Sequence, residues 1–548
     1  MVKWLMKTRN MSFDSTRCFL AFLCLNLFMI GCSNENAATL SRKSIIYCSE
    51  GSPESFNPQI VISSTTIDAT SNQLYNSLIT HKGDDNVLSP AIAKSWHITR
   101  DGTKITFYLR QDINFHQTSY FTPTRTLNAD DVLFSFNRIL DSEHEYHDVS
   151  GGSYPFFQRI NFDELVEDIE KLNEYTVRFT LSRPDSSFLA NLATDFAVIL
   201  SKEYADNLSA TYSQQQIDLL PIGTGPFKYK EYRAGSFIRY SAHENYWQKN
   251  INIEHLIFDI TPSNTGRLTK LLAKECDVVS YPIAHNKIIE RSDLVLNEIT
   301  SFNLAYLGFN TTKAPFNNKL VRKAISYAIN KEAIIDAIYF GKADIASSII
   351  PPASWAYDKN IPEQEYSISK AINTLNEAGY PDGFTMNLWA MPVERAFNPD
   401  ALTMAKLIAV DLQKIGINVN IIYDYEWNIF LKLIGEGQHH AALLGWTAEH
   451  PDPDNFFTPL LSCSSTSQGY IGTFWCNREV DELIKQSLQT SDISSRKEYY
   501  SEVLKIAEDE IPLIPIAHSK RFQGRSKNIS GQLLKPFGGI TFEKVKKN

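Results

Sequence analysis

The chain has 548 residues, of which 43% are hydrophobic and 21% charged, and its formal net charge is −9. This length exceeds one ordinary domain and leaves room for roughly two to four lobes with a cleft between them. The acidic balance favours cationic partners, and no basic stripe with interleaved aromatic residues points to nucleic acid. Beyond the N-terminus no stretch reaches the roughly 18 to 20 apolar residues of a membrane span, so we expect a soluble, globular body.

The first 31 residues have the pattern of a secretory signal peptide. Four basic residues precede its apolar run: Lys3, Lys7, Arg9 and Arg17. An apolar run over 18–30 follows and ends at Gly31-Cys32, which resembles a bacterial lipobox with Met29 in place of the usual leucine. We therefore expect removal of residues 1–31, acylation of Cys32 and a polar tether over 32–42 that holds the protein at a membrane surface. Ordinary cleavage without a lipid is the alternative.

Seven cysteines divide into groups once the leader is set aside. Cys18 and Cys24 leave with the signal and Cys32 takes the lipid, so four remain: Cys48, Cys276, Cys463 and Cys476. An even set in an oxidising compartment predicts two disulfides. Cys463 and Cys476 close a short loop and form the natural pair, which leaves Cys48 for Cys276. A zinc site is the competing interpretation, but the spacing is not C-x2-C and no histidine pair accompanies it.

Strand and helix patterns alternate through the first half of the body. Residues 44–48 and 104–109 are predicted strands, the second with apolar residues at every other position. A helix begins after Asn128, a good N-cap, because two aspartates in its first turn suit the positive end of the helix dipole. Residues 177–181 form another alternating strand.

A second series of elements begins near residue 300. A buried strand is predicted over 302–310, followed by helices that begin at Asn318 and Asn330. Further predicted elements are a strand over 385–389, a helix over 402–415, a strand over 419–423 and helices over 480–488 and 495–509. This alternation indicates an α/β lobe, which ends in a proline-punctuated extended run over 511–517.

Common catalytic signatures are absent from the sequence. It has no H-E-x-x-H, G-x-S-x-G or G-x-x-x-x-G-K-[ST] motif. Gly223-Thr-Gly225 is followed by Pro226, which opposes a phosphate-binding helix start and favours a structural turn. Residues 143–148 include metal-ligand types, but their spacing matches no common site and indicates a solvated turn. We expect no enzyme, no catalytic residue and no resident metal, with an exported hydrolase as the remote alternative.

Several segments resemble the bacterial extracellular solute-binding proteins of family 5, which include peptide, dipeptide, haem and nickel receptors. The segments are 93–98 (AKSWHI), 107–110 (FYLR), 128–132 (NADDV), 221–227 (PIGTGPF) and 243–247 (HENYW). The resemblance covers essentially the whole mature chain. Residues 47–58 are similar to dipeptide-binding receptors, whereas 232–239, 265–272 and 354–358 are more similar to the SapA-like branch of peptide-transport receptors, which we favour.

This resemblance implies an α/β fold of the periplasmic binding protein type (cluster C), with two lobes joined by a hinge. Lobe I would span 43–302 and include an inserted subdomain at about 74–222. Lobe II would span 303–517, and the chain would return to lobe I over 518–548. The chain would cross between the lobes near 300–303 and near 515–521, and closure on a ligand would be a hinge motion.

The resemblance also implies where a peptide would bind. In dipeptide-binding relatives, an aspartate in a Gly-Trp-x-x-Asp motif pairs with the peptide α-ammonium, and an arginine in a Pro-Val-x-Arg motif binds the carboxylate. Buried charges of this kind must be paired to offset their lost hydration. Here the first motif is Gly445-Trp446-Thr-Ala-Glu449 and the second ends at Arg395. The alternatives are an exposed loop position for Glu449 and a surface ion pair between Arg395 and Glu394.

Backbone groups are expected to supply affinity that does not depend on peptide sequence. We predict that the extended segment with Asn303, Ala305 and Tyr306 pairs with the peptide main chain as an added strand. The hydroxyl of Thr65 would contribute from the opposite lobe.

The leading hypothesis is therefore a monomeric receptor in the periplasmic space, held by its lipid anchor, that captures peptides, including cationic antimicrobial ones. It would deliver them to the inner-membrane permease of an ABC importer. The alternative is a haem-binding lipoprotein receptor, which would need an exposed histidine or tyrosine at the cleft. No cofactor is expected unless haem is itself the transported ligand, and no nucleic acid partner is expected.

Overall fold

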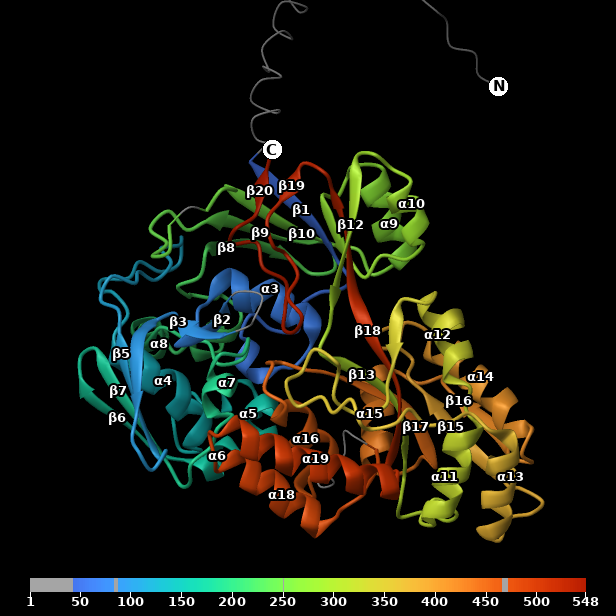
Figure 1. The fold of residues 1–548 in the computed structure, drawn as a ribbon. Helices are drawn as coiled ribbons and strands as arrows, with labels where there is room; N and C mark the ends of the chain where they lie inside the picture. The colour runs from blue at the N-terminus through green and yellow to red at the C-terminus, as the bar shows by residue number, and fades with distance from the viewer. Residues whose placement is uncertain (1–42, 83–86, 250, 466–471) are drawn as a thin grey trace, which may run out of the picture.

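The computed structural model describes residues 43–82, 87–249, 251–465 and 472–548 (Figure 1). The predicted signal peptide, lipobox and acylated Cys32 lie outside the described residues. Within the described ranges, every helix is too short or too polar to cross a bilayer. The fold is mixed α/β, as the sequence predicts.

One long strand, β18 (Leu513–Ser526), takes part in both large layers of the molecule. Its first residues pair antiparallel with β13 (Asn303–Phe309), and its residues 520–526 pair antiparallel with β12 (Leu294–Thr300). Figure 1 shows β18 running from beside β12 to beside β13. The chain therefore passes between the two halves at the β12–β13 connection and again in the middle of β18.

The first half is built on a sheet around β1 (Ser44–Ser49), which lies parallel to both β10 and β11. The strand order is β11-β1-β10-β9-β8, with β11 beside β18. Its other elements are β8 (Phe227–Arg233), β9 (Phe237–Ala242), β10 (His255–Ile260), β11 (Val278–Ser280), η1 (Pro58–Ile60), α3 (Ser64–Leu74), α9 (Asn264–Leu272), α10 (His285–Ile289), β19 (Ile529–Ser530) and β20 (Lys546–Lys547).

A separate layer lies between α3 and β8 in sequence and occupies the left of Figure 1. Its four-stranded antiparallel sheet has the order β4-β5-β7-β6. The strands of this sheet are β4 (Ala93–Ile98), β5 (Lys104–Leu109), β6 (Val166–Asn173) and β7 (Thr176–Leu181). A separate two-stranded sheet is formed by β2 (Ile79–Lys82) and β3 (Val87–Pro90). The helices are α4 (Ala129–Leu140), η2 (Asp148–Ser150), α5 (Pro155–Arg159), α6 (Phe162–Leu165), α7 (Phe188–Leu192), α8 (Lys202–Ala210) and η3 (Gln214–Asp218). We call this layer the inserted subdomain.

The predicted cap of α4 is confirmed. The Asn128 side chain accepts the backbone N–H of Asp130 at 3.0 Å, and the Asp131 carboxylate accepts the backbone N–H of Asn128 at 2.9 Å. These two bonds satisfy donors that the first turn of a helix otherwise leaves open.

The second half is a sheet of order β16-β15-β17-β13-β18. Its strands are β14 (Ala343–Ile345), β15 (Thr385–Ala390), β16 (Asn418–Ile422) and β17 (Ala441–Thr447), besides β13 and β18. Its helices are α11 (Lys319–Ala328), α12 (Lys331–Tyr339), α13 (Ile368–Glu377), α14 (Ala401–Gln413), α15 (Trp427–Gly435), α16 (Asp454–Leu461), α18 (Arg478–Leu488) and α19 (Ile493–Glu510). The proline-punctuated run proves to be the start of β18, where the register with β13 shifts between Ala305 and Tyr306, opposite Pro515.

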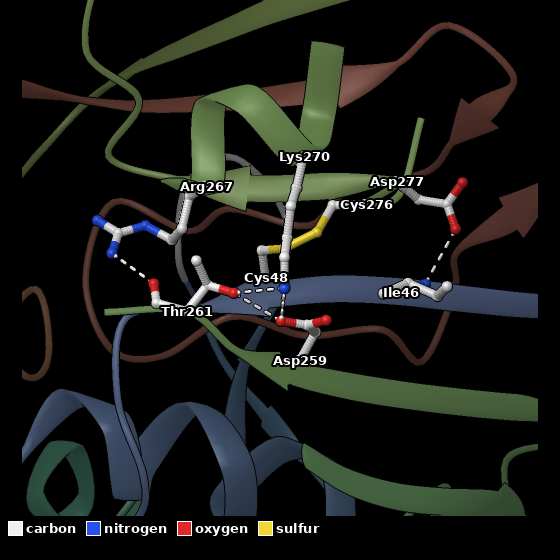
Figure 2. Close-up of a disulfide and its surroundings, with 8 residues drawn as sticks. All are labelled: Ile46, Cys48, Asp259, Thr261, Arg267, Lys270, Cys276 and Asp277. Carbon is white, nitrogen blue, oxygen red and sulfur yellow. Dashed lines mark hydrogen bonds and ion pairs between the residues drawn. A yellow bond between two sulfur atoms is a disulfide. The ribbon is translucent and has the colours of Figure 1, made fainter. Parts of the chain in front are cut away.

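The structure joins the cysteines in the predicted pairs, Cys48 with Cys276 and Cys463 with Cys476. All four sulfur atoms are thus used, which overturns the zinc interpretation. Figure 2 shows that the first disulfide ties β1 to the segment just before β11. Close to it, the Lys270 ammonium lies 2.6 Å from the Asp259 carboxylate, and the Asp277 carboxylate accepts the backbone N–H of Ile46 at 2.9 Å.

Candidate functional site

The segment that ends in Glu449 continues from β17, beside the central strand β13. Gly445 of β17 lies opposite Ala305 of β13. A Cβ atom at Gly445 would lie 2.1 Å from the Phe397 ring and 2.6 Å from the Leu304 carbonyl oxygen. Only glycine allows this approach, so Gly445 is accounted for by packing, and its contact with a ligand stays a prediction.

Phe397 belongs to a tight loop that carries Arg395. The backbones of Arg395 and Asn398 exchange two hydrogen bonds of 3.1 and 3.0 Å. Two hydroxyls hold this loop from outside, because Tyr339 donates to the Phe397 carbonyl and Ser519 to the Ala396 carbonyl, both at 2.6 Å. The Phe397 ring packs against Gly445 of β17 and therefore brings together the two motifs that the sequence singles out.

The Arg395 guanidinium has open hydrogen-bonding capacity. Its Nη1 donates to the Glu394 carbonyl at 3.0 Å, and its centre lies 5.4 Å from the Trp427 ring. Among the described residues it has no carboxylate within ion-pair distance, and it contacts Glu394 only through the backbone carbonyl, so the alternative of an Arg395–Glu394 ion pair is wrong. The Glu394 carboxylate instead accepts a hydrogen bond from Asn264 of α9, in the first half of the molecule. Arg395 is suited to hold a carboxylate through a two-pronged contact.

Glu449 is half-buried and paired, which contradicts the alternative of an exposed loop glutamate. Its side chain is 16% exposed and forms an ion pair with Arg159 of α5, in the inserted subdomain. Asn455 accepts the backbone N–H of Glu449 at 2.9 Å and also donates to its carboxylate at 3.3 Å. The carboxylate thus has a cationic partner from across the molecule and an amide partner from the first turn of α16.

Aromatic rings hold the cationic partner in place. The Arg159 guanidinium lies 5.0 Å from the Trp446 ring and 5.5 Å from the Phe156 ring. A guanidinium over an aromatic face is stabilised by the ring quadrupole. The Trp446 ring thus contacts a group from the opposite half of the molecule, and its indole N–H is buried with no hydrogen-bond partner among the described residues.

The residues after Glu449 extend this contact between the halves. His450 is 1% exposed, and its ring Nε2 lies 3.0 Å from the amide oxygen of Asn191 in α7. Asp452 accepts two hydrogen bonds from Arg496 of α19, at 2.7 and 2.8 Å. The backbone N–H of Ser186 donates to the Leu488 carbonyl of α18 at 2.8 Å. Residues 446–452 therefore lie between the inserted subdomain and the C-terminal helices and contact both.

The prediction that Asn303 to Tyr306 pair with a peptide main chain is wrong. Strand β13 is covered on both edges, by β17 and by β18, so it offers no free edge. Asn303, Ala305 and Tyr306 are each at most 2% exposed. The Asn303 side chain accepts the backbone N–H of Ser519 at 2.9 Å and donates to the Ser519 hydroxyl at 3.0 Å. Asn303 therefore joins the two crossing segments.

Thr65 lies in the first turn of α3 and is half-buried, where its methyl group faces Gly51. Its contact with a ligand stays a prediction. Sequence reasoning missed Arg159, Phe397 and Asn455. Arg159 and Glu449 are 290 positions apart, and no local sequence pattern predicts a partner at such a distance.

Three comparisons place the chain among known proteins. The profile of "Bacterial extracellular solute-binding proteins, family 5 Middle" matches residues 87–468. The dipeptide-binding protein of Escherichia coli is 42% identical over 93% of this chain and 95% of its own length. Haem-binding protein A of Haemophilus influenzae is 40% identical over 92% of each chain. The peptide transport periplasmic protein SapA of Salmonella typhimurium is 39% identical over 93% of each chain.

A solved structure agrees with these relatives. The dipeptide-binding protein of Pseudoalteromonas sp. SM9913, in complex with Met-Leu, superposes with a TM-score of 0.86 and 45% identity, over 92% of this chain and all of that one. The identities to the dipeptide-binding, haem-binding and SapA proteins differ little, so they do not separate the SapA-like branch from the others.

The buried imidazole of His450 gives a testable pH dependence. Burial lowers the pKa of His450 to about 3 from its ordinary 6.5, so the folded protein keeps the ring neutral where the unfolded chain protonates it. Stability from this group is present above pH 6.5 and is lost as the pH falls below it. Between pH 7 and pH 5 the loss is about 2 kcal/mol.

Urea unfolding at both pH values checks this. His450→Gln should lose about 2 kcal/mol less than wild type between pH 7 and pH 5, because the other histidines are unchanged in the comparison. The control His97→Gln alters an exposed ring and should behave as wild type. Equal pH-dependent losses in wild type and His450→Gln would rule out the assignment.

Proposed function

We propose, because the chain belongs to the bacterial extracellular solute-binding proteins of family 5, that it captures peptides outside the cytoplasm and delivers them to the permease of an ABC importer. Relatives along nearly its whole length include dipeptide-binding and di/tripeptide-binding proteins. A similar solved structure is a complex with the dipeptide Met-Leu. The peptide lies between two lobes that close about the crossing segments at β12–β13 and in mid-β18.

The observation that carries this proposal is the position of the two motifs. Glu394, beside Arg395, contacts Asn264 of the first half, and Glu449 contacts Arg159 of the inserted subdomain. Both motifs therefore lie where the second half meets the first, and Phe397 on Gly445 fixes their relative placement. A ligand enclosed there would meet Arg395, whose guanidinium is suited to a carboxylate.

Haem is the second candidate ligand, because haem-binding protein A of Haemophilus influenzae is 40% identical to this chain. A haem receptor needs an accessible axial ligand. Tyr425 is 39% exposed and stacks on Trp389 with ring centroids 5.3 Å apart. Trp389 packs on Phe430, which also packs on Trp427 beneath Arg395. The phenol of Tyr425 is therefore the group to which we assign axial ligation if haem binds.

The protein acts in the periplasmic space, as a monomer anchored by acyl chains on Cys32. Support comes from the basic and apolar pattern of residues 1–31, from the Gly31-Cys32 ending and from the periplasmic location in the name of the SapA relative. Two acyl signals on one residue hold a protein at a bilayer more firmly than a single chain does. The permease partner lies in the inner membrane.

Arg395 tests the peptide hypothesis. Isothermal titration of the refolded, ligand-stripped mature chain with a set of dipeptides to pentapeptides, Met-Leu included, should yield a binder. Arg395→Gln should weaken the tightest binder about 10- to 100-fold, since a charge-assisted contact to its carboxylate is lost. The control Arg178→Gln removes an arginine that pairs with Glu170 on the inserted subdomain and should bind as wild type. Unchanged affinity in Arg395→Gln would place the carboxylate elsewhere, and binding of no peptide would refute the function.

Cys32 tests the anchor. Cells that express the full chain and are fed radiolabelled palmitate should label the wild-type protein and leave Cys32→Ala unlabelled. Cys32→Ala should also move from the membrane fraction to the soluble fraction. The control Cys463→Ala/Cys476→Ala, which lacks a disulfide of the body, should keep its label. Unlabelled wild type would show that Cys32 carries no lipid.

A further inference from the structure

The ion pair between Arg159 and Glu449 bears on which peptides this receptor accepts. Glu449 stands at the position that the family resemblance assigns to the peptide α-ammonium. Arg159 reaches it from α5, at the last residue of that helix, while Glu449 follows the end of β17. Both side chains are mostly buried, at 13% and 16% exposed. The carboxylate is therefore already neutralised by a cation that belongs to the protein.

The surroundings of Arg159 hold its guanidinium at the carboxylate. Phe156 and Trp446 place aromatic rings against it from the two halves of the molecule, at 5.5 and 5.0 Å from their centroids. Among the described residues, Glu449 is the only carboxylate within ion-pair distance of Arg159. A ligand that displaced the guanidinium would leave a partly buried cation without its partner, which is strongly unfavourable.

A second cation brought to the same carboxylate would meet the guanidinium as well. The second Glu449 oxygen lies 3.3 Å from the Asn455 amide nitrogen, a donor that this carboxylate already accepts. An added ammonium would repel the adjacent guanidinium, and in a partly buried site this repulsion is weakly screened. The site therefore attracts a peptide α-ammonium much more weakly than an unpaired carboxylate would.

We infer that Arg159 takes the place of a ligand ammonium at Glu449, so that this receptor binds peptides without requiring a free N-terminus. N-blocked peptides, and ligands with an uncharged group at that end, are accepted as well as free ones. The inference rests on the proposed function and makes Arg159 a specificity-determining residue of the same cleft. In this arrangement Arg159, and not the peptide α-ammonium, makes the charged contact with Glu449 that links the two lobes.

The test compares one peptide in two forms. The tightest binder from the set of dipeptides to pentapeptides is titrated calorimetrically with a free N-terminus and with an N-acetyl group. Wild type should bind the two forms with affinities within about 3-fold of each other. Arg159→Gln frees the Glu449 carboxylate and should prefer the free form by about 10-fold or more. Arg159→Lys keeps a cation at Glu449 and should retain the wild-type ratio.

Two controls separate this effect from general damage. The double variant Arg159→Gln/Glu449→Gln should lose the preference that Arg159→Gln gains, because the carboxylate is gone. Arg178→Gln, elsewhere on the inserted subdomain, should keep the wild-type ratio. Thermal unfolding of each variant verifies that it is folded.

The outcomes distinguish the inference from the function on which it rests. If wild type binds the free form more than about 30-fold tighter than the acetylated form, the inference is overturned while peptide capture stands. If folded wild type binds neither form of any peptide, peptide capture itself is overturned, and the inference with it. The wild-type ratio decides the question even if Arg159→Gln does not fold.

Discussion

The two halves of this molecule are held in register by strand β18, which hydrogen-bonds to β13 in one half and to β12 in the other. Because one continuous strand serves both sheets, the halves cannot separate without breaking a main-chain ladder on one side of residues 517–520. Asn303 reinforces the crossing with hydrogen bonds from β13 to Ser519. These two adjacent crossing segments are the place of the hinge in the proposed closure on a ligand.

The placement of the candidate site residues follows from that crossing. Ser519 lies in the middle of β18 and also donates to the Ala396 carbonyl, so the segment that crosses between the halves positions the loop of Arg395. Phe397 of the same loop packs on Gly445, and β17 then leads to Glu449. From the other side, α5 of the inserted subdomain presents Arg159 to that carboxylate. The residues proposed for peptide recognition therefore also form contacts between the halves.

Patterns local in sequence predicted the structure well. The side chains of Asn128, Asn318 and Asn330 cap helices as expected, because capping depends on residues two or three positions away. The cysteine pairs are also as predicted, since four cysteines in an oxidising compartment leave few choices. The prediction of the fold rests on the family resemblance, whose segments are spread along the length of the chain.

Noncovalent interactions between segments distant in sequence could not be predicted. The apolar pattern of residues 303–309 indicates a buried strand, but only the sheet order shows that both of its edges are occupied. The Gly-Trp-x-x-Glu motif predicts that Glu449 binds a ligand ammonium, whereas in the structure it pairs with Arg159, 290 positions away. Phe397 belongs to neither of the two motifs. Only the structure shows that its ring packs into the space that Gly445 leaves by having no Cβ atom.

The central claim, that this chain is a peptide receptor, is tested most directly by native mass spectrometry of the mature protein purified without unfolding. We expect several mass increments over the bare chain, and fragmentation of the released ligands should give series of amino-acid residue masses. A single increment equal to the mass of haem, with no peptide fragments, would contradict it.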